Sequence, residues 1–209
     1  TDPGVFIRSM ATRGHLGGMA LAAPEAIRIL DAAGMDLVIV ETVGVGQAEV
    51  EVAGATDTTL VVVSPGWGDA VQVAKAGILE IADVFVVNKA DRDGAGEAAR
   101  DLELMVKMGA PRDADWRPPV VKTSAATGDG VDELWSAIQQ HHEHLSATGA
   151  LDRNRRARLL VEVETLAAQR VRERVERELR ADSDLADRLA GREIDPYRAT
   201  NMLLDELTA

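Results

Sequence analysis

Short apolar runs alternate with helical patterns along the first 145 or so residues of the chain. The runs occupy residues 37–40, 59–63, 84–87 and 120–121. Runs this short, bounded by turn residues and apolar at successive positions, predict strands that are buried on both faces. Strands that alternate with helices form parallel sheets through right-handed crossovers. The pattern therefore predicts an α/β fold with a doubly wound, mostly parallel sheet.

Amphipathic patterns between these runs predict the helices that cover the sheet. The first begins at Pro24 and is closed by Gly34, because proline suits the first turn of a helix and glycine its end. The others are expected near residues 48–53, 69–78, 95–108 and 132–145.

The pattern changes after Thr148-Gly149. No glycine or proline occurs between Arg153 and Arg180, and apolar residues recur there at a four-residue spacing. This pattern predicts one long helix with a narrow apolar stripe and charged flanks, followed by two shorter helices. We expect a first domain of residues 1–148 and a helical arm of residues 149–209. The stripe is expected to pack on a second copy of the chain, and packing on its own domain is the alternative.

Composition narrows the classes of partner. The 209 residues carry a net charge of −12, which argues against general nucleic-acid binding, since that function needs basic surfaces. No apolar run approaches the length that spans a bilayer, so no membrane partner is expected. The absence of cysteine agrees with a reducing compartment, and we expect the cytoplasm.

The motif Asn88-Lys89-Ala90-Asp91 follows the apolar run at 84–87. Ligands of open α/β sheets bind at the carboxyl ends of strands. A carboxylate at Asp91 can accept two parallel hydrogen bonds from N1–H and the 2-amino group of guanine, and adenine offers neither donor there. Lys89 can lay its methylene stem along the base, and Asn88 can tie the loop to its neighbours. The alternative is a plain turn capped by Asp91.

A second polar run, Thr123-Ser124-Ala125, follows the apolar run at 120–121. It stands where the backbone N–H of Ala125 can reach O6 of guanine. We therefore expect Ser124 and Ala125 to belong to the same nucleotide-binding site as Asp91.

A third segment, Glu41-Thr42-Val43-Gly44, follows the run at 37–40. An acid at a strand end with glycine three residues on fits a metal and γ-phosphate site. Glu41 is predicted to contact Mg²⁺ through water, and Gly44 to present its N–H to the γ-phosphate, because a glycine permits close approach. A solvated acid and a turn glycine are the alternatives. Gln47 can orient an attacking water, as glutamines do in some nucleotide-hydrolysing enzymes, or cap the next helix.

These motifs resemble the methylmalonyl-CoA mutase-associated GTPases, also known under the arginine/ornithine transport-kinase (ArgK-type) label. The resembling segments lie between residues 5 and 91: Phe6–Ser9, Gly14–Gly18, Glu41–Gln47, Pro65–Asp69, Lys75–Ile78, Glu80–Asp83 and Val87–Asp91. The resemblance implies the later part of a SIMIBI-class P-loop G domain that uses GTP/GDP and Mg²⁺, with a helical dimerisation arm.

The resemblance also implies a function. The family acts as a GTPase chaperone of a cobalamin-dependent acyl-CoA mutase, gating delivery of adenosylcobalamin and protecting the mutase. The resemblance places Lys75 in a mobile segment that couples nucleotide state to the mutase. Lys75 is therefore, with Gln47, a candidate catalytic residue. A solvated lysine beside an ordinary helix cap is the alternative.

One family motif is missing. The phosphate loop, G-x-x-x-x-G-K-[ST], does not occur in the 209 residues, and Arg13–Gly18 is rich in glycine but lacks the lysine and the spacing. The resemblance places this loop ahead of Thr1, and we expect little GTP turnover from the chain by itself. Two other functions stay open: a non-hydrolysing dimeric interaction module, and another SIMIBI GTPase such as a metallochaperone.

A histidine cluster at 141, 142 and 144 falls at the end of the helix predicted over 132–145. No acid or cysteine at a ligand spacing accompanies it. We expect a solvated helix end.

Overall fold

The computed structural model describes residues 2, 4–10, 23–42, 48–66, 78–109, 115–181 and 183–208. The chain divides into two compact units, residues 1–155 and residues 156–209. Each unit is described by itself below.

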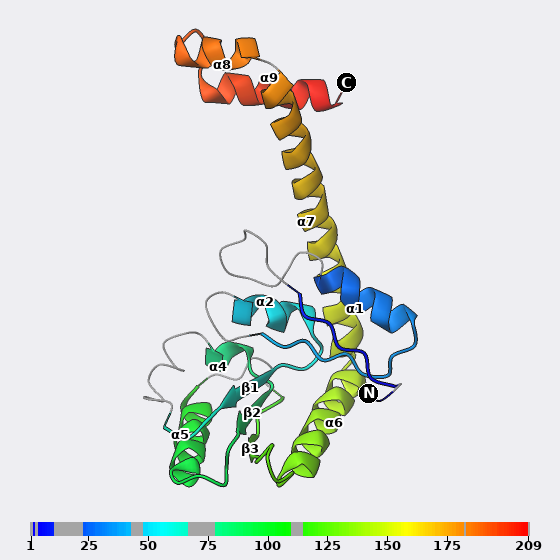
Figure 1. Cartoon of the computed structure of the whole chain (residues 1–209), viewed down its shortest axis with the longest axis vertical. Helices are drawn as coiled ribbons and strands as arrows, with labels where there is room; N and C mark the ends of the chain where they lie inside the picture. Colours follow the sequence, from blue (N-terminus) through cyan, green and yellow to red (C-terminus); the bar gives the residue numbers. More distant parts are fainter. Residues whose placement is uncertain are drawn as a thin grey trace. The chain divides into compact units, whose positions relative to one another are not determined.

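The first unit contains a parallel sheet of three strands in the order β1-β2-β3 (Figure 1). The strands are β1 (Leu60–Val63), β2 (Val84–Val87) and β3 (Val120–Lys122). Val63 pairs with Val87, and Val87 pairs with Lys122. All three strands therefore end at the same edge of the sheet, as the sequence pattern predicted.

Helices cover both faces of this sheet. Side chains of a strand alternate between faces, and Phe85 and Val87 pack in a cluster with Leu102 of α5 (Ala95–Met108). Val84 and Val86 pack instead with Ala137 of α6 (Val131–Ala147). Figure 1 shows α5 and α6 on opposite sides of the strands. The predicted doubly wound α/β fold is confirmed.

Within the described residues the first unit also contains α1 (Ala23–Ala32), α2 (Ala48–Ala55) and α4 (Ile78–Ile81). The helix expected over 69–78 lies largely outside the described residues. The strand expected at 37–40 is wrong: these residues form no strand, and Ile39 is 81% exposed. An apolar run only favours extended backbone, and a strand also needs a neighbour whose N–H and C=O groups pair with its own.

The long helix predicted after Gly149 is confirmed as α7 (Ala150–Ala181). The second unit contains most of α7 together with α8 (Ser183–Ala190) and α9 (Pro196–Thr208). Its core consists of Leu185, Ile194, Ala199 and Leu203. Although α7 is long, neither it nor any other described helix is apolar enough to cross a bilayer.

The expectation of a solvated histidine cluster is wrong for His141, which is only 3% exposed. Its Nδ1 lies 2.9 Å from Oγ1 of Thr58, and its Nε2 lies 3.5 Å from Oδ1 of Asp83. The ring of Trp116 packs on it at 4.9 Å between centroids. His141 follows Ala137 by four positions, so it lies on the face of α6 that packs on the sheet.

Candidate functional site

Two loops leave the carboxyl edge of the sheet side by side, at residues 88–91 after β2 and 123–125 after β3. Asn88 N–H donates to the carbonyl of Val63 at 2.8 Å, and Thr123 N–H donates to that of Val87 at 2.9 Å. The Ala90 N–H then donates to the carbonyl of Thr123 at 2.9 Å. The ladder thus continues past the strands and holds both loops in one register.

The side chain of Asn88 joins these two loops. Its Oδ1 accepts a hydrogen bond from the backbone N–H of Ala125 at 3.2 Å and one from Oγ1 of Thr123 at 3.4 Å. Asn88 is half-buried and Ala125 is exposed. The N–H that the sequence suggested for guanine O6 therefore points, in this structure, at Asn88.

The Asp91 side chain is held by Ser124. Ser124 Oγ donates to Asp91 Oδ1 at 2.7 Å, and Ser124 is 1% exposed whereas Asp91 is exposed. This hydrogen bond is the main cause that lowers the pKa of Asp91, and a backbone N–H also lowers it. Desolvation opposes these effects, and the positive charges of Arg92 and Lys89 lower the pKa further. Asp91 thus stays ionised and presents a pure hydrogen-bond acceptor.

Lys89, between Asn88 and Asp91 in the sequence, has an unusual backbone conformation. Its φ of 59° is left-handed, and its carbonyl accepts a hydrogen bond from Arg92 N–H at 3.0 Å. A side chain other than glycine in this region costs roughly 1–2 kcal/mol. Strain of this kind concentrates at functional sites, where the surrounding structure holds it in place.

Sequence reasoning missed the loop that closes behind Ser124. Ser124 N–H donates to the carbonyl of Asp129 at 2.9 Å, and Gly128 N–H donates to the carbonyl of Ser124 at 2.8 Å. Gly128 and Gly130 both have positive φ, at 85° and 75°. The signal was present in the sequence as the Gly128-Asp129-Gly130 turn directly after the polar run.

The structure does not place the remaining predicted site residues with the two loops of residues 88–91 and 123–125. Glu41 is exposed at the end of the segment 37–42, and within the described ranges it makes no hydrogen bond. Gly44, Gln47 and Lys75 lie outside the described residues. Among the side chains that the structure describes, no group of three or more His, Asp or Glu is arranged to hold a metal ion.

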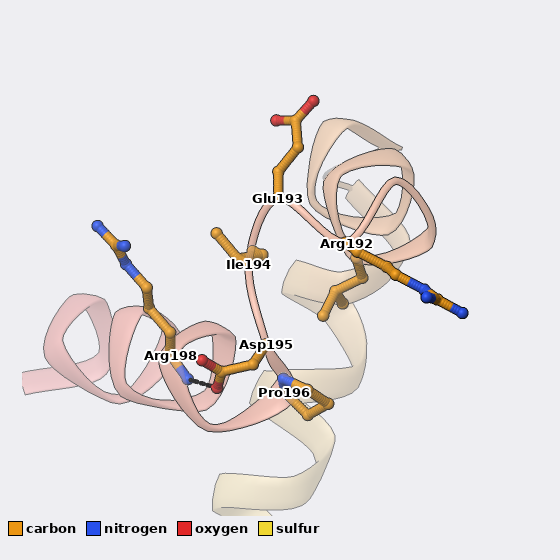
Figure 2. Close-up of a pocket in the computed structure, with 7 residues that line it drawn as sticks. Arg192, Glu193, Ile194, Asp195, Pro196 and Arg198 are labelled. Atoms are coloured by element: carbon orange, nitrogen blue, oxygen red, sulfur yellow. Dashed lines mark hydrogen bonds between the residues drawn. The ribbon is translucent and has the colours of Figure 1, made fainter.

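A hollow of about 390 Å³ lies in the second unit at the turn from α8 to α9 (Figure 2). Its lining includes Arg192, Glu193, Asp195 and Arg198. Figure 2 shows the long side chains of Arg192, Glu193 and Arg198 pointing away from one another. Asp195 is used locally, since its Oδ1 accepts the Arg198 N–H at 2.9 Å and caps α9. Polar groups do not converge here as they do around Asp91.

A parallel sheet with helices on both faces, and with its polar loops gathered at one edge, defines the doubly wound α/β class. Within that class the chain has the SIMIBI fold, since it resembles the structure titled "Crystal structure of LAO/AO transport system kinase" with a TM-score of 0.62 and 31% identity. That match covers 90% of this chain and 62% of the other. The chain belongs to the family described as "Methylmalonyl Co-A mutase-associated GTPase MeaB", whose sequence profile matches residues 1–180.

The names of several related proteins are consistent with this family. The "Putative GTPase PYRAB02490" of Pyrococcus abyssi is 46% identical over 211 residues, covering 99% of this chain and 65% of that protein. The "Methylmalonic aciduria type A homolog, mitochondrial" of Mus musculus is 33% identical over 210 residues, covering 97% of this chain and 50% of that protein. The "GTPase ArgK" of Escherichia coli is 40% identical over 153 residues, or 72% of this chain and 46% of that protein. The chain thus spans less than two thirds of the length of these relatives.

Proposed function

We propose that the whole protein binds and hydrolyses GTP in the cytoplasm as a chaperone of an adenosylcobalamin-dependent mutase of the methylmalonyl-CoA type. It gates cofactor delivery to the mutase and protects it. The single observation that carries this proposal is the ionised, Ser124-held carboxylate of Asp91 at the carboxyl edge of the sheet. Family membership adds the class of nucleotide and the class of partner.

Guanine recognition follows from the acceptor capacity of Asp91. Each carboxylate oxygen can accept two hydrogen bonds, and Ser124 uses one position on Oδ1. Both oxygens therefore remain able to accept, one from N1–H and one from the 2-amino group of guanine. Hydrogen bonds to a charged acceptor contribute about 1.5–3 kcal/mol each. Lys89 covers one face of the base with its stem.

The base O6 is the natural partner of the loop after β3. The Ala125 N–H donates to Asn88 over 3.2 Å, a long bond to an exposed group. A guanine O6 placed beside it shares or takes over this donor. Ser124 then acts through Asp91, because its hydroxyl is buried against that carboxylate.

Phosphate and metal binding use residues outside this loop pair. We assign Glu41 to a water-mediated Mg²⁺ contact, Gly44 to the γ-phosphate and Gln47 to the attacking water. Lys75 belongs to a segment that couples nucleotide state to the mutase. Hydrolysis relaxes the segments around 41–49 and 66–75, which is order–disorder switching by the γ-phosphate. A phosphate loop of the G-x-x-x-x-G-K-[ST] type elsewhere in the whole protein completes the site.

The helical arm is proposed to form a homodimer. Its apolar stripe is open to solvent in the single chain: Leu160, Val163 and Leu159 are 67%, 65% and 54% exposed. Burying such side chains is favourable by about 25 cal/mol per Å², and a second copy offers the same stripe. We expect Val163→Glu to give a monomer by light scattering, while Ala168→Glu, an exposed control on α7, stays dimeric. A dimer that survives Val163→Glu contradicts this assignment.

Asp91→Asn in the protein at its natural length tests base recognition. The amide turns one acceptor into a donor, so GTP affinity falls and affinity for XTP, whose base carries oxygen at C2, rises. We expect a shift in the GTP:XTP affinity ratio of about a hundredfold, from one lost charged bond and one gained. Asp93→Asn, an exposed change two residues away, serves as control. An Asp91→Asn protein that prefers GTP unchanged disproves the base assignment.

A second function is favoured by one observation, the exposed apolar stripe of α7 with Leu159, Leu160 and Val163. On this alternative the chain is a dimerising interaction module without turnover. GTP hydrolysis by the protein at its natural length separates the two, since a module shows none. Co-purification with a cobalamin-dependent mutase separates the proposed chaperone from other SIMIBI metallochaperones.

A further inference from the structure

Gly130 makes the closest backbone approach at the candidate site. It is the N-cap residue directly before α6, with φ 75° and ψ 2°. A Cβ added at Gly130 would lie 2.0 Å from the carbonyl oxygen of Lys122, 3.0 Å from the Lys122 carbonyl carbon and 3.2 Å from Cα of Thr123. These atoms belong to the main chain at the end of β3, so no rotation of a side chain relieves the overlap.

The backbone that Gly130 contacts leads directly into the base-binding loop. Thr123, at one contact point, donates to Asn88, and the next two residues hold Asp91 and Asn88 through Ser124 Oγ and the Ala125 N–H. The Asp129 carbonyl, one residue before Gly130, accepts the Ser124 N–H at 2.9 Å. The position of Gly130 therefore sets where the donors of residues 123–125 lie.

We propose that Gly130 is a positioning residue for guanine recognition. Its lack of a side chain lets the turn of residues 124–130 close onto the end of β3, and this closure aims Ser124 at Asp91. Any side chain there lifts the turn away from β3 and moves Ser124 and Ala125 with it. The inference rests on the proposed binding of a guanine nucleotide and adds a residue that does not touch the ligand.

Gly128 provides a matched control within the same turn. Its φ is 85°, so a side chain there meets the same left-handed backbone penalty as at Gly130. An added Cβ at Gly128 has no heavy atom within 4 Å, however. Gly128→Ala and Gly130→Ala therefore share the conformational strain, and only Gly130→Ala adds the overlap with Lys122.

The experiment compares affinities of the two variants and the wild type for GDP and IDP, in the protein at its natural length. IDP differs from GDP only in lacking the 2-amino group of the base. Phosphate contacts therefore cancel in the IDP:GDP ratio of dissociation constants, and this ratio measures the contact of the 2-amino group with Asp91. We expect Gly130→Ala to reduce this preference for GDP by about tenfold, the loss of one charged hydrogen bond. Gly128→Ala is expected to keep the wild-type ratio. General destabilisation weakens both nucleotides alike and leaves the ratio unchanged.

Each outcome decides the matter. A wild type that does not prefer GDP over IDP disproves the proposed guanine site, whereas a wild-type preference retained in Gly130→Ala overturns the role of Gly130. Should Gly130→Ala fail to fold, amide hydrogen exchange of the wild type gives the answer. A base that requires the closed turn stabilises it by mass action, so saturating GDP slows exchange at Ser124 and Gly128. Unchanged exchange there, with GDP bound, overturns the inference.

Discussion

Ser124 and Asp91 are 33 residues apart in the sequence, and the Ser124 hydroxyl donates to Asp91 Oδ1 at 2.7 Å. The parallel pairing of β2 and β3 brings the two residues to one edge of the sheet. The serine is buried and the carboxylate is exposed. A buried donor thus orients an exposed acceptor, and the free lone pairs of Asp91 point to where a ligand can reach them.

The pH dependence of nucleotide binding tests this pair. Ser124 is the main cause of the lowered pKa of Asp91, so the carboxylate of the wild type is protonated only at a lower pH than an ordinary aspartate. A carboxyl whose pKa is lower in the folded state stabilises the fold fully at pH values above its unfolded-state pKa. This stabilisation is lost as the pH falls through the folded-state pKa. We expect Ser124→Ala to raise the pKa of Asp91 and to lose GDP binding at a higher pH than the wild type.

The Asp91 carboxyl titration by ¹³C NMR measures the effect, together with GDP affinity across the acid range. Ser136→Ala, an exposed serine on α6, is the control and should leave both curves in place. An Asp91 titration that is the same in Ser124→Ala and wild type would show that the hydroxyl does not hold the charge.

Lys89 offers a test that separates stability from binding. Lys89→Gly relieves the left-handed strain at φ 59° and removes the stem that we propose covers the base. The relief of roughly 1–2 kcal/mol is offset in part by the greater freedom of glycine in the unfolded chain. We expect thermal stability to rise slightly while GDP affinity falls. Lys89→Ala keeps the strain and loses the stem, so its affinity should fall without any gain in stability; equal melting temperatures for the two variants contradict the strain.

Arg155 and Asp57 join the start of α7 to the loop before β1. Arg155 donates to both carboxylate oxygens of Asp57, from Nη2 to Oδ2 at 2.6 Å and from Nε to Oδ1 at 3.3 Å. Both side chains are partly solvated, at 53% and 27% exposure, so we expect Arg155→Ala to lower the free energy of unfolding by about 1 kcal/mol or less. Arg156→Ala, its exposed neighbour, should have a smaller effect.

The salt dependence of this pair is the sharper measurement. Because surface ion pairs are screened, the difference between Arg155→Ala and Arg156→Ala should shrink at about 1 M salt. Asp57 raises the pKa of Arg155 in the folded state. The stabilisation from this ion pair is therefore complete at pH values below the unfolded-state pKa of Arg155. It is lost only as the pH rises through the folded-state pKa, at strongly alkaline pH. A loss of the difference between pH 6 and 9 would therefore contradict the assignment to Arg155.

His141 anchors α6 at the opposite end of the strands. His141→Ala removes one hydrogen-bond partner of Thr58 and one ion-pair partner of Asp83, and it opens a cavity beside Trp116. The loss of these two contacts together with the cavity costs roughly 2–4 kcal/mol. His142→Ala changes the exposed neighbour and should stay within about 0.5 kcal/mol of the wild type. Chemical denaturation measures both, and similar midpoints would show that His141 is not a packing residue.

Much of this protein could be predicted from local pattern. The apolar run at 84–87 predicted β2, and the periodicity over 95–108 predicted α5. The lack of glycine and proline from Arg153 to Arg180 predicted a helix that crosses the boundary between the two units. Each of these predictions depends on side chains within a few residues of one another, because strand and helix periods and turn chemistry are properties of neighbouring positions.

The sequence by itself thus determined the α/β class, the parallel sheet and the place of Asn88 and Asp91 after a strand. Only the tertiary structure decided that residues 37–40 form no strand and that His141 is buried. It also decided that Ser124 donates a hydrogen bond to Asp91 and that Gly130 lies against the backbone at the end of β3. Those facts depend on which segments become neighbours across the sheet. The register between strands and the packing of α6 bring distant residues within hydrogen-bonding distance, and no local period in the sequence encodes that pairing.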